Sequence, residues 1–172
     1  MGFFTFPHRL QGTRIFFSAA ARYVIREGYL FRNRSDGGSF VGFMDSKAFS
    51  MTRMLDYEVE DIIAELLCIT DLENTISIWH MANDYDESMQ SLEDSSRNVY
   101  LFLFFTEPEK GGRGHGSTII KSMQKGLQEH GLGCSLSTHN EKNLDMYRHL
   151  GFRVVRTRSN TEGDAQFFLR YP

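Results

Sequence analysis

The feature that most constrains the fold of this chain is a glycine-rich bend between two regular elements. Residues 111–117 read Gly-Gly-Arg-Gly-His-Gly-Ser, after the apolar run 99–106 and before an amphipathic pattern over 117–130. The first N–H groups of a helix have no internal acceptor, and the helix dipole adds partial positive charge there. Glycines let the backbone approach an anion with no Cβ in the way. The sequence therefore predicts that a phosphate-bearing ligand binds at 111–117.

The elements around this bend predict a β-α-β unit. The run 99–106 is typical of a strand buried on both faces, and Pro108 ends it. The helix over 117–130 would turn four apolar residues inward: Ile119, Ile120, Met123 and Leu127. A strand at 134–138 then lies parallel to the first, which puts the bend at the carboxyl end of that strand, where open α/β sheets bind ligands. A helix at 142–150 and an antiparallel strand pair, 152–157 with 165–171, complete the C-terminal half.

The N-terminal half gives weaker patterns. Its expected elements are a helix at 13–31, a turn at 36–38, a strand at 39–44 that pairs with 49–54 as a hairpin, an amphipathic helix spanning Val59 to Leu67, and a helix at 73–89. We expect Ile76, Trp79 and Ala82 on the inner side of the last helix.

Composition favours one soluble domain. The chain has 172 residues, 41% of them apolar, and a formal net charge of −3, which gives no reason to expect nucleic acid as a partner. No apolar run approaches the length of a membrane span and no signal pattern opens the chain, so we expect a cytoplasmic protein without a membrane partner. Cys68 and Cys134 have no metal-type spacing, and we expect two buried free thiols in a reducing compartment.

Two familiar phosphate loops fit the bend poorly. A Walker-type loop needs Gly-Lys-Ser/Thr, but the corresponding place here reads His115-Gly116-Ser117 and no lysine follows. A dinucleotide fingerprint needs a carboxylate at the end of the next strand, and 134–138 has none. A glycine-rich surface turn without a ligand remains an alternative when the loop is taken alone.

A second set of residues favours one family. Asn143 and Tyr147 are four apart on the helix after 134–138, so they share a face, and Gly151-Phe152 follows them. Together with the segment 107–117, this Asn-x-x-x-Tyr-x-x-x-Gly-Phe pattern resembles the GCN5-related N-acetyltransferase (GNAT) superfamily. That family has a Gln/Arg-x-x-Gly-x-Gly/Ala loop after an acidic-proline turn. The resemblance covers residues 99–158, and the N-terminal half matches only in general plan.

The resemblance implies a fold and a domain layout. The fold would be α/β (α+β): a mixed, twisted central sheet of about six to seven strands, flanked by helices, with one splayed parallel strand pair. Residues 1–172 would form a single domain. Residues 1–98 would be the substrate-side half, with its first strand short or absent, and 99–172 would be the acetyl-CoA-binding core.

The resemblance also implies a cofactor site for acetyl-CoA, with no metal. Backbone groups of Phe104 and Thr106 would pair with the pantetheine arm, and Asn143 would hold it. The diphosphate would lie on the amides of Gly112, Gly114 and Gly116, near the charges of Lys110 and Arg113, with Ser117 as a cap or phosphate contact. The expected cofactor-binding set also includes Phe105, Gly111, His115 and Tyr147.

The implied reaction is direct transfer of an acetyl group to a primary amine of a small molecule or peptide. The backbone N–H of Phe105 would donate to the carbonyl oxygen, and Tyr147 would be the general acid for the leaving thiolate. A core tyrosine with a satisfied hydroxyl is the structural alternative for Tyr147.

Three departures keep a second class of function open. Gly111 stands where the family has Gln or Arg, Asn98 stands near the place where a relative has a histidine, and Ser137 stands where a carboxylate is common. The general base is therefore unassigned, with His80 and Asp84 as candidates, and Glu65 and His139 behind them. Solvated surface residues are the alternative for all four. A non-catalytic CoA-binding module is the alternative function.

The partner class is less constrained. Asp84, Asp86 and Glu87 form an acidic run that would attract a cationic amine, unless it is only a solvated helix face. Apolar helix faces over 55–92 make a homodimer possible.

Overall fold

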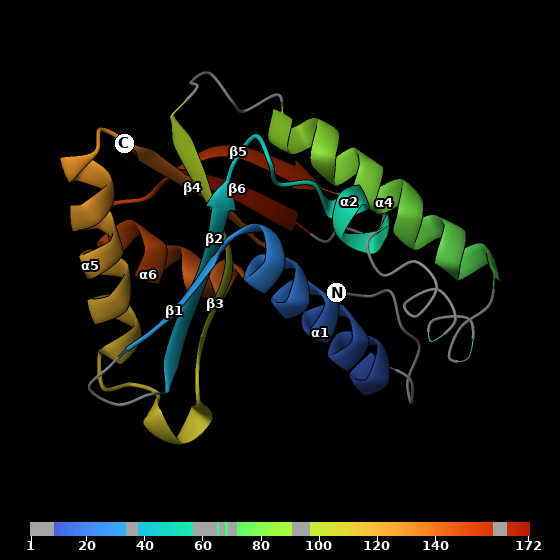
Figure 1. The fold of residues 1–172 in the computed structure, drawn as a ribbon, viewed down its shortest axis with the longest axis horizontal. Helices are drawn as coiled ribbons and strands as arrows, with labels where there is room; N and C mark the ends of the chain where they lie inside the picture. The colour runs from blue at the N-terminus through green and yellow to red at the C-terminus, as the bar shows by residue number, and fades with distance from the viewer. Residues whose placement is uncertain are drawn as a thin grey trace. The chain divides into compact units, whose positions relative to one another are not determined.

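The chain divides into two compact units. A computed structural model describes residues 9–33, 38–56, 65, 68, 72–90, 97–159 and 165–172 (Figure 1). The helical unit comprises 1–27 and 47–94, and the sheet unit comprises 28–46 and 95–172.

The sheet unit is built on a six-stranded mixed sheet in the order β1-β2-β3-β4-β6-β5. The strands are β1 (Tyr29–Arg32), β2 (Ser39–Asp45), β3 (Asn98–Thr106), β4 (Gly133–Thr138), β5 (Arg153–Ser159) and β6 (Ala165–Tyr171). Only the central β3–β4 pair is parallel, so two antiparallel halves, β1-β2-β3 and β4-β6-β5, meet at one parallel ladder. The predicted strand number and parallel pair are confirmed.

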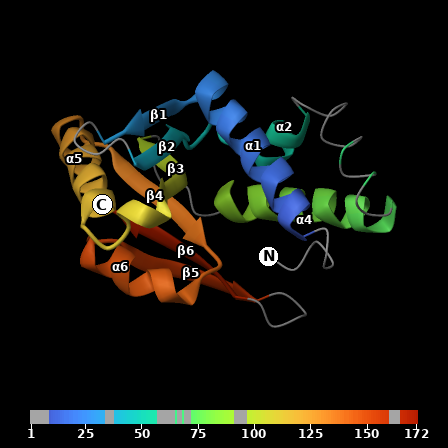
Figure 2. The same ribbon diagram turned by 90° about the horizontal axis from the view of Figure 1, so that it is seen from below.

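Two helices of this unit cover one face of the sheet. They are α5 (His115–Glu129) and α6 (Leu144–His149), and two short 3₁₀ turns precede them, η1 (Pro108–Lys110) and η2 (Glu141–Asn143). Both helices turn apolar side chains into one core cluster with the sheet, and they are neighbours in both views (Figures 1 and 2). The four predicted inward residues of α5 all belong to this cluster or pack against it: Ile119, Ile120, Met123 and Leu127.

The helical unit contains α1 (Arg9–Glu27), α2 (Met51–Asp56) and α4 (Leu72–Gln90). Asp86 on α4 is buried, and its carboxylate accepts hydrogen bonds at the start of α2: from the Thr52 N–H (3.0 Å), the Thr52 hydroxyl (2.7 Å), the Ser50 hydroxyl (2.8 Å) and the Met51 N–H. A carboxylate from one helix thus caps the N-terminus of another, where the helix dipole favours negative charge.

Two predictions for the N-terminal half were wrong. The segment 49–54 is not a strand, because the Asp86 cap starts α2 at Met51. The hairpin partner of β2 is β1, with Tyr29 opposite Phe43. The predicted helix 13–31 ends at Glu27, and after Gly28 the chain extends as β1, in which Tyr29 and Phe31 favour a strand.

Smaller expectations also need correction. Ile76 is 48% exposed rather than inward, whereas Ala82 is buried. Cys68 is exposed, so only Cys134 is a buried thiol. The helix expected from Val59 to Leu67 and the core of the turn at 36–38 fall outside the described residues. None of the described helices has the length and hydropathy needed to cross a bilayer.

Candidate functional site

The two parallel strands part soon after they meet. Their ladder has three residue pairs, Asn98 with Gly133, Val99 with Cys134 and Tyr100 with Ser135, although β3 runs on to Thr106. A bulge in the β2–β3 ladder adds one residue to β3, since Gly42 is opposite Leu103 and Phe43 is opposite Leu101. Bulges bend a strand and increase its twist. The predicted splay is therefore present, and it leaves an open edge on β3.

The alternation of backbone groups along β3 decides which amides face this opening. The Glu107 N–H donates to the Gly38 carbonyl (2.8 Å), so the residues two apart from it turn their N–H and C=O toward β2. By this alternation Phe104 and Thr106 turn theirs toward the open edge. The same alternation directs the Phe105 N–H to β2, where Phe105 is opposite Phe40. Phe104 and Thr106, not Phe105, present backbone donors to the opening.

The glycine loop continues from this end of β3. η1 closes with the Gly111 N–H donating to the Pro108 carbonyl (3.1 Å), so that amide is already used. Gly112 and Gly114 have φ of +72° and +78°, in the left-handed region that side chains with a Cβ rarely adopt. The bend therefore requires glycine at both positions.

The start of α5 is prepared for an anion. Gly114 is the N-cap and supplies no side-chain cap, and the first turn has no acidic residue. The first helical bond is from the Thr118 N–H to the Gly114 carbonyl (3.0 Å), which leaves the N–H groups of Gly116 and Ser117 without an intrahelical acceptor. Ser117 lies within the first turn, so the suggestion that it caps the helix was wrong.

Two cations lie in the loop, in different states. The Lys110 ammonium pairs with the Glu107 carboxylate at 3.0 Å. Arg113 is exposed and forms no ion pair within the part of the chain that the structure describes. Of the two, Arg113 is therefore the cation without a carboxylate partner among the described residues.

Tyr147 is buried on α6 beside the sheet, and its ring meets that of Phe152 edge-on at 5.8 Å. Burial, and then the neighbouring Tyr100 and Cys134, raise the pKa of Tyr147 to about 12, so it stays protonated at neutral pH. Its hydroxyl makes no hydrogen bond to any described residue.

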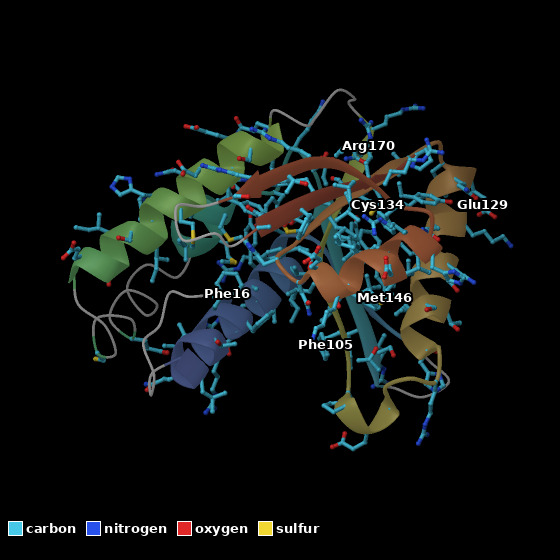
Figure 3. All side chains as sticks on the ribbon, turned by 180° about the vertical axis from the view of Figure 1, so that it is seen from behind. Phe16, Phe105, Glu129, Cys134, Met146 and Arg170 are labelled. Carbon is cyan, nitrogen blue, oxygen red and sulfur yellow. The ribbon has the colours of Figure 1, made fainter. Side chains whose placement is uncertain are left out.

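Asn143 lies four residues before Tyr147, at the junction of η2 and α6. Its backbone N–H donates to the Asn140 carbonyl (3.0 Å), and its side chain does not cap α6. The Asn143 amide thus shares a helix face with Tyr147 and is not used in capping. In Figure 3 the labelled Phe105, Cys134 and Met146 mark β3, β4 and α6 around this region.

Three of the four base candidates lie in the helical unit, and the fourth, His139, directly follows β4 in the sheet unit. His80 and Asp84 are exposed on α4 and belong to the helical unit, so their relation to the opening stays a prediction. Glu65 and His139 are also exposed. Asp86 is consumed by the α2 cap, so the proposed acidic run keeps only Asp84 and Glu87 at the surface.

One polar pair at the opening was missed from sequence. The Tyr100 and Ser137 hydroxyls lie 3.2 Å apart, bridging β3 and β4 where the ladder ends, and Asn98 Nδ2 donates to Ser135 Oγ (2.9 Å) one step earlier. The signal was available: polar residues in two otherwise apolar strands of a β-α-β unit.

Solved structures with a similar fold are acetyltransferases. The chain matches a Drosophila melanogaster polyamine N-acetyltransferase with a TM-score of 0.59, 12% identity, and coverage of 87% of this chain and 78% of that one. It also matches the Escherichia coli ribosomal-protein-S18-alanine N-acetyltransferase (TM-score 0.41, 20% identity, 45% of this chain and 56% of that one). Arabidopsis thaliana Naa50, solved with a CoA-peptide bisubstrate analogue, gives a TM-score of 0.40 at 18% identity, over 46% of this chain and 58% of that one.

The last two matches span little more than half the length of those proteins. No protein-family model and no curated protein matches the sequence. The fold evidence therefore comes from the longest of these matches and from the sheet itself, with its splayed parallel pair and glycine loop. The chain has the fold of the GCN5-related N-acetyltransferase superfamily, as its two motifs predicted.

Proposed function

We propose that this protein is an acetyl-CoA-dependent N-acetyltransferase that acts on a primary amine. The observation that carries the proposal is the coincidence of two openings: the unpaired edge of β3 beyond Tyr100, and the uncapped start of α5 at the same end of that strand. An extended thioester arm needs backbone partners, and a diphosphate needs N–H donors. The chain offers both within residues 104–117.

The residues present fit coenzyme A in chemistry and spacing. Phe104 and Thr106 would pair with the amides of the pantetheine arm as a neighbouring strand does. The amides of Gly112, Gly114 and Gly116 would hold the diphosphate, with the charge of Arg113 nearby. Gly111 offers neither a side chain nor a spare amide, so Arg113 and the helix start carry more of the binding.

The chain's own groups suggest how transfer is assisted. Bound acetyl-CoA supplies an acetyl group activated as a thioester. A backbone N–H at the open edge of β3 would stabilise charge on the carbonyl oxygen. Tyr147 would donate a hydrogen bond to the departing sulfur, because its raised pKa keeps the proton on the phenol. The amine must lose a proton before attack, and His80 and Asp84 remain the proposed bases.

The acceptor is proposed at the level of class. The Drosophila neighbour forms N-acetylagmatine from a small amine, and Naa50 was solved with a peptide-based analogue. Those activities belong to those proteins, and they favour small amines and peptide N-termini as the acceptors to test. The homodimer through 55–92 also stays a proposal.

The test has two steps. Calorimetry with acetyl-CoA on folded protein should show binding at a single site, and Arg113→Gln should weaken it several-fold. A panel of agmatine, polyamines and short peptides should then release free thiol with at least one acceptor. Binding without turnover across the panel would favour the non-catalytic CoA-binding module, and absence of binding would reject both functions.

A further inference from the structure

A second, separate groove lies within the sheet unit, between the β1–β2 hairpin and α5. Its volume is about 680 Å³, within the range of roughly 300–1,000 Å³ that is typical of small-ligand sites. One wall is aromatic and is formed by Tyr29, Phe31 and Phe43. The opposite wall is the α5 ridge that carries Thr118, Ser122 and Gly126.

The aromatic wall is ordered but only partly covered. Phe31 and Phe43 stack at 5.2 Å with ring planes 6° apart, and Tyr29 lies 5.9 Å from Phe43. Tyr29 is 64% exposed and Phe31 is 47% exposed. Apolar ring surface left in water in this way gains free energy from any apolar body that covers it.

The α5 wall is kept low by small residues. Thr118, Ser122 and Gly126 are four apart, so they form one ridge facing the rings. A Cβ built on Gly126 would meet no atom within 4 Å, so no packing contact demands glycine there. Glycine destabilises a helix interior relative to alanine. Gly126 thus makes α5 less stable than alanine would, and its lack of a side chain leaves space in the groove.

The charge at the groove is positive. Arg32 lines it, is exposed, and forms no ion pair with the residues that the structure describes. Among the described lining residues there is no carboxylate, and the His130 ring Nδ1 lies 2.8 Å from the Gly126 carbonyl oxygen. An apolar slot with an arginine at its rim is complementary to an apolar molecule that carries one negative charge.

We propose that this groove binds an amphipathic carboxylate, a small acid whose apolar body lies between the aromatic wall and Gly126 while its carboxylate meets Arg32. The groove uses none of the loop residues 111–117 or the open edge of β3. The ligand is therefore neither the acyl donor nor the acceptor of the proposed reaction, and the site exists whether or not that reaction does.

The experiment measures binding of decanoate by calorimetry, with decylamine as the opposite-charge probe. The wild-type protein should bind decanoate at one site. It should bind decanoate at least about tenfold more tightly than decylamine, because Arg32 attracts the carboxylate and repels the ammonium group. Arg32→Gln should weaken decanoate binding about fivefold and remove the preference for the acid. Equal affinity for both probes would overturn the proposal.

Gly126 supplies the matched pair of variants. Gly126→Leu fills the floor and should abolish decanoate binding, whereas Gly126→Ala should fold at least as stably as the wild type and keep most of it. Unchanged binding in Gly126→Leu would overturn the proposal. So would displacement of decanoate by acetyl-CoA, which would put the acid in the thioester site.

A second copy of the chain is the competing occupant. Light scattering that shows a dimer which Gly126→Leu dissociates, together with no decanoate binding, would assign the groove to self-association and overturn the proposal. A monomer that binds decanoate supports it.

Discussion

Gly116, in the first turn of α5, lies against the ring of Phe104 on β3. A Cβ at Gly116 would stand 2.8 Å from Phe104 Cζ and 3.2 Å from Thr106 Oγ1, closer than side chains tolerate without movement. The start of the helix and the open edge of the strand are therefore held in direct contact. Because Gly116 has no Cβ, the start of α5 can lie against β3, and this contact positions the two parts of the proposed cofactor site.

Replacing Gly116 with alanine should disturb both fold and site. We expect Gly116→Ala to lower the free energy of unfolding by about 1–3 kcal/mol, because the Phe104 ring must move. It should also weaken acetyl-CoA binding. Gly126→Ala, in the same helix but in open space, is the control and should raise stability by up to about 1 kcal/mol. Urea unfolding measures the stability of both variants, and calorimetry measures their affinity for acetyl-CoA. Equal effects of the two substitutions would show that the contact with Phe104 does not restrict position 116.

Tyr147→Phe should separate chemistry from binding. The ring and its contact with Phe152 remain, so stability and acetyl-CoA affinity should change little. The lost hydroxyl should reduce kcat by about 10²-fold or more if it assists departure of the sulfur. Steady-state thiol release with the best amine of the panel is the measurement, and an unchanged kcat would remove Tyr147 from the mechanism.

Stability should fall in alkaline solution through two buried groups. Burial raises the pKa of Cys134 from 9.0 to about 12 and that of Tyr147 from 10.0 to about 12. Between about pH 9 and 12 for Cys134, and between about pH 10 and 12 for Tyr147, the unfolded chain has released the proton and the folded chain has not, so each group costs up to about 1.4 kcal/mol per pH unit there. Below pH 9 both states hold the protons and the contribution is constant. Urea unfolding at stepped pH should show a shallower alkaline loss in Tyr147→Phe.

The Asp86 cap on α2 should contribute more to the free energy of unfolding than an exposed carboxylate does. Asp86→Ala leaves the Thr52 N–H and the Ser50 and Thr52 hydroxyls without their acceptor, and we expect a loss of about 2–4 kcal/mol. Asp84→Ala, two residues away and exposed, should change stability by no more than about 0.5 kcal/mol. Denaturant titration of the pair measures the difference, and equal effects would mean that the cap contributes nothing.

The parts predicted well from sequence were those that neighbouring residues determine. The α5 helix, its inward residues and the bend before it follow from local periodicity and from glycines that must adopt positive φ. The parallel pair followed from the β-α-β order alone. Tyr147 lies on α6, and Asn143, four residues earlier, is the N-cap of that helix.

The errors came from interactions between distant residues. The segment 49–54 has strand-like composition, but a carboxylate more than thirty residues later starts a helix there. The direction of the amides along β3 also depends on a non-local interaction, the pairing of that strand with β2. Likewise, the residue that ends α1 is clear only once Tyr29 is seen opposite Phe43.

The short central ladder gives this sheet a seam. Three residue pairs join two antiparallel halves that are each paired along most of their length. The β3–β4 ladder is therefore the shortest ladder in the central part of this sheet. An extended ligand bound between β3 and β4 would form backbone hydrogen bonds with both strands and so connect the two halves of the sheet. For such a sheet, occupancy and rigidity rise together, and protection of the β3 and β4 amides against hydrogen exchange would report both.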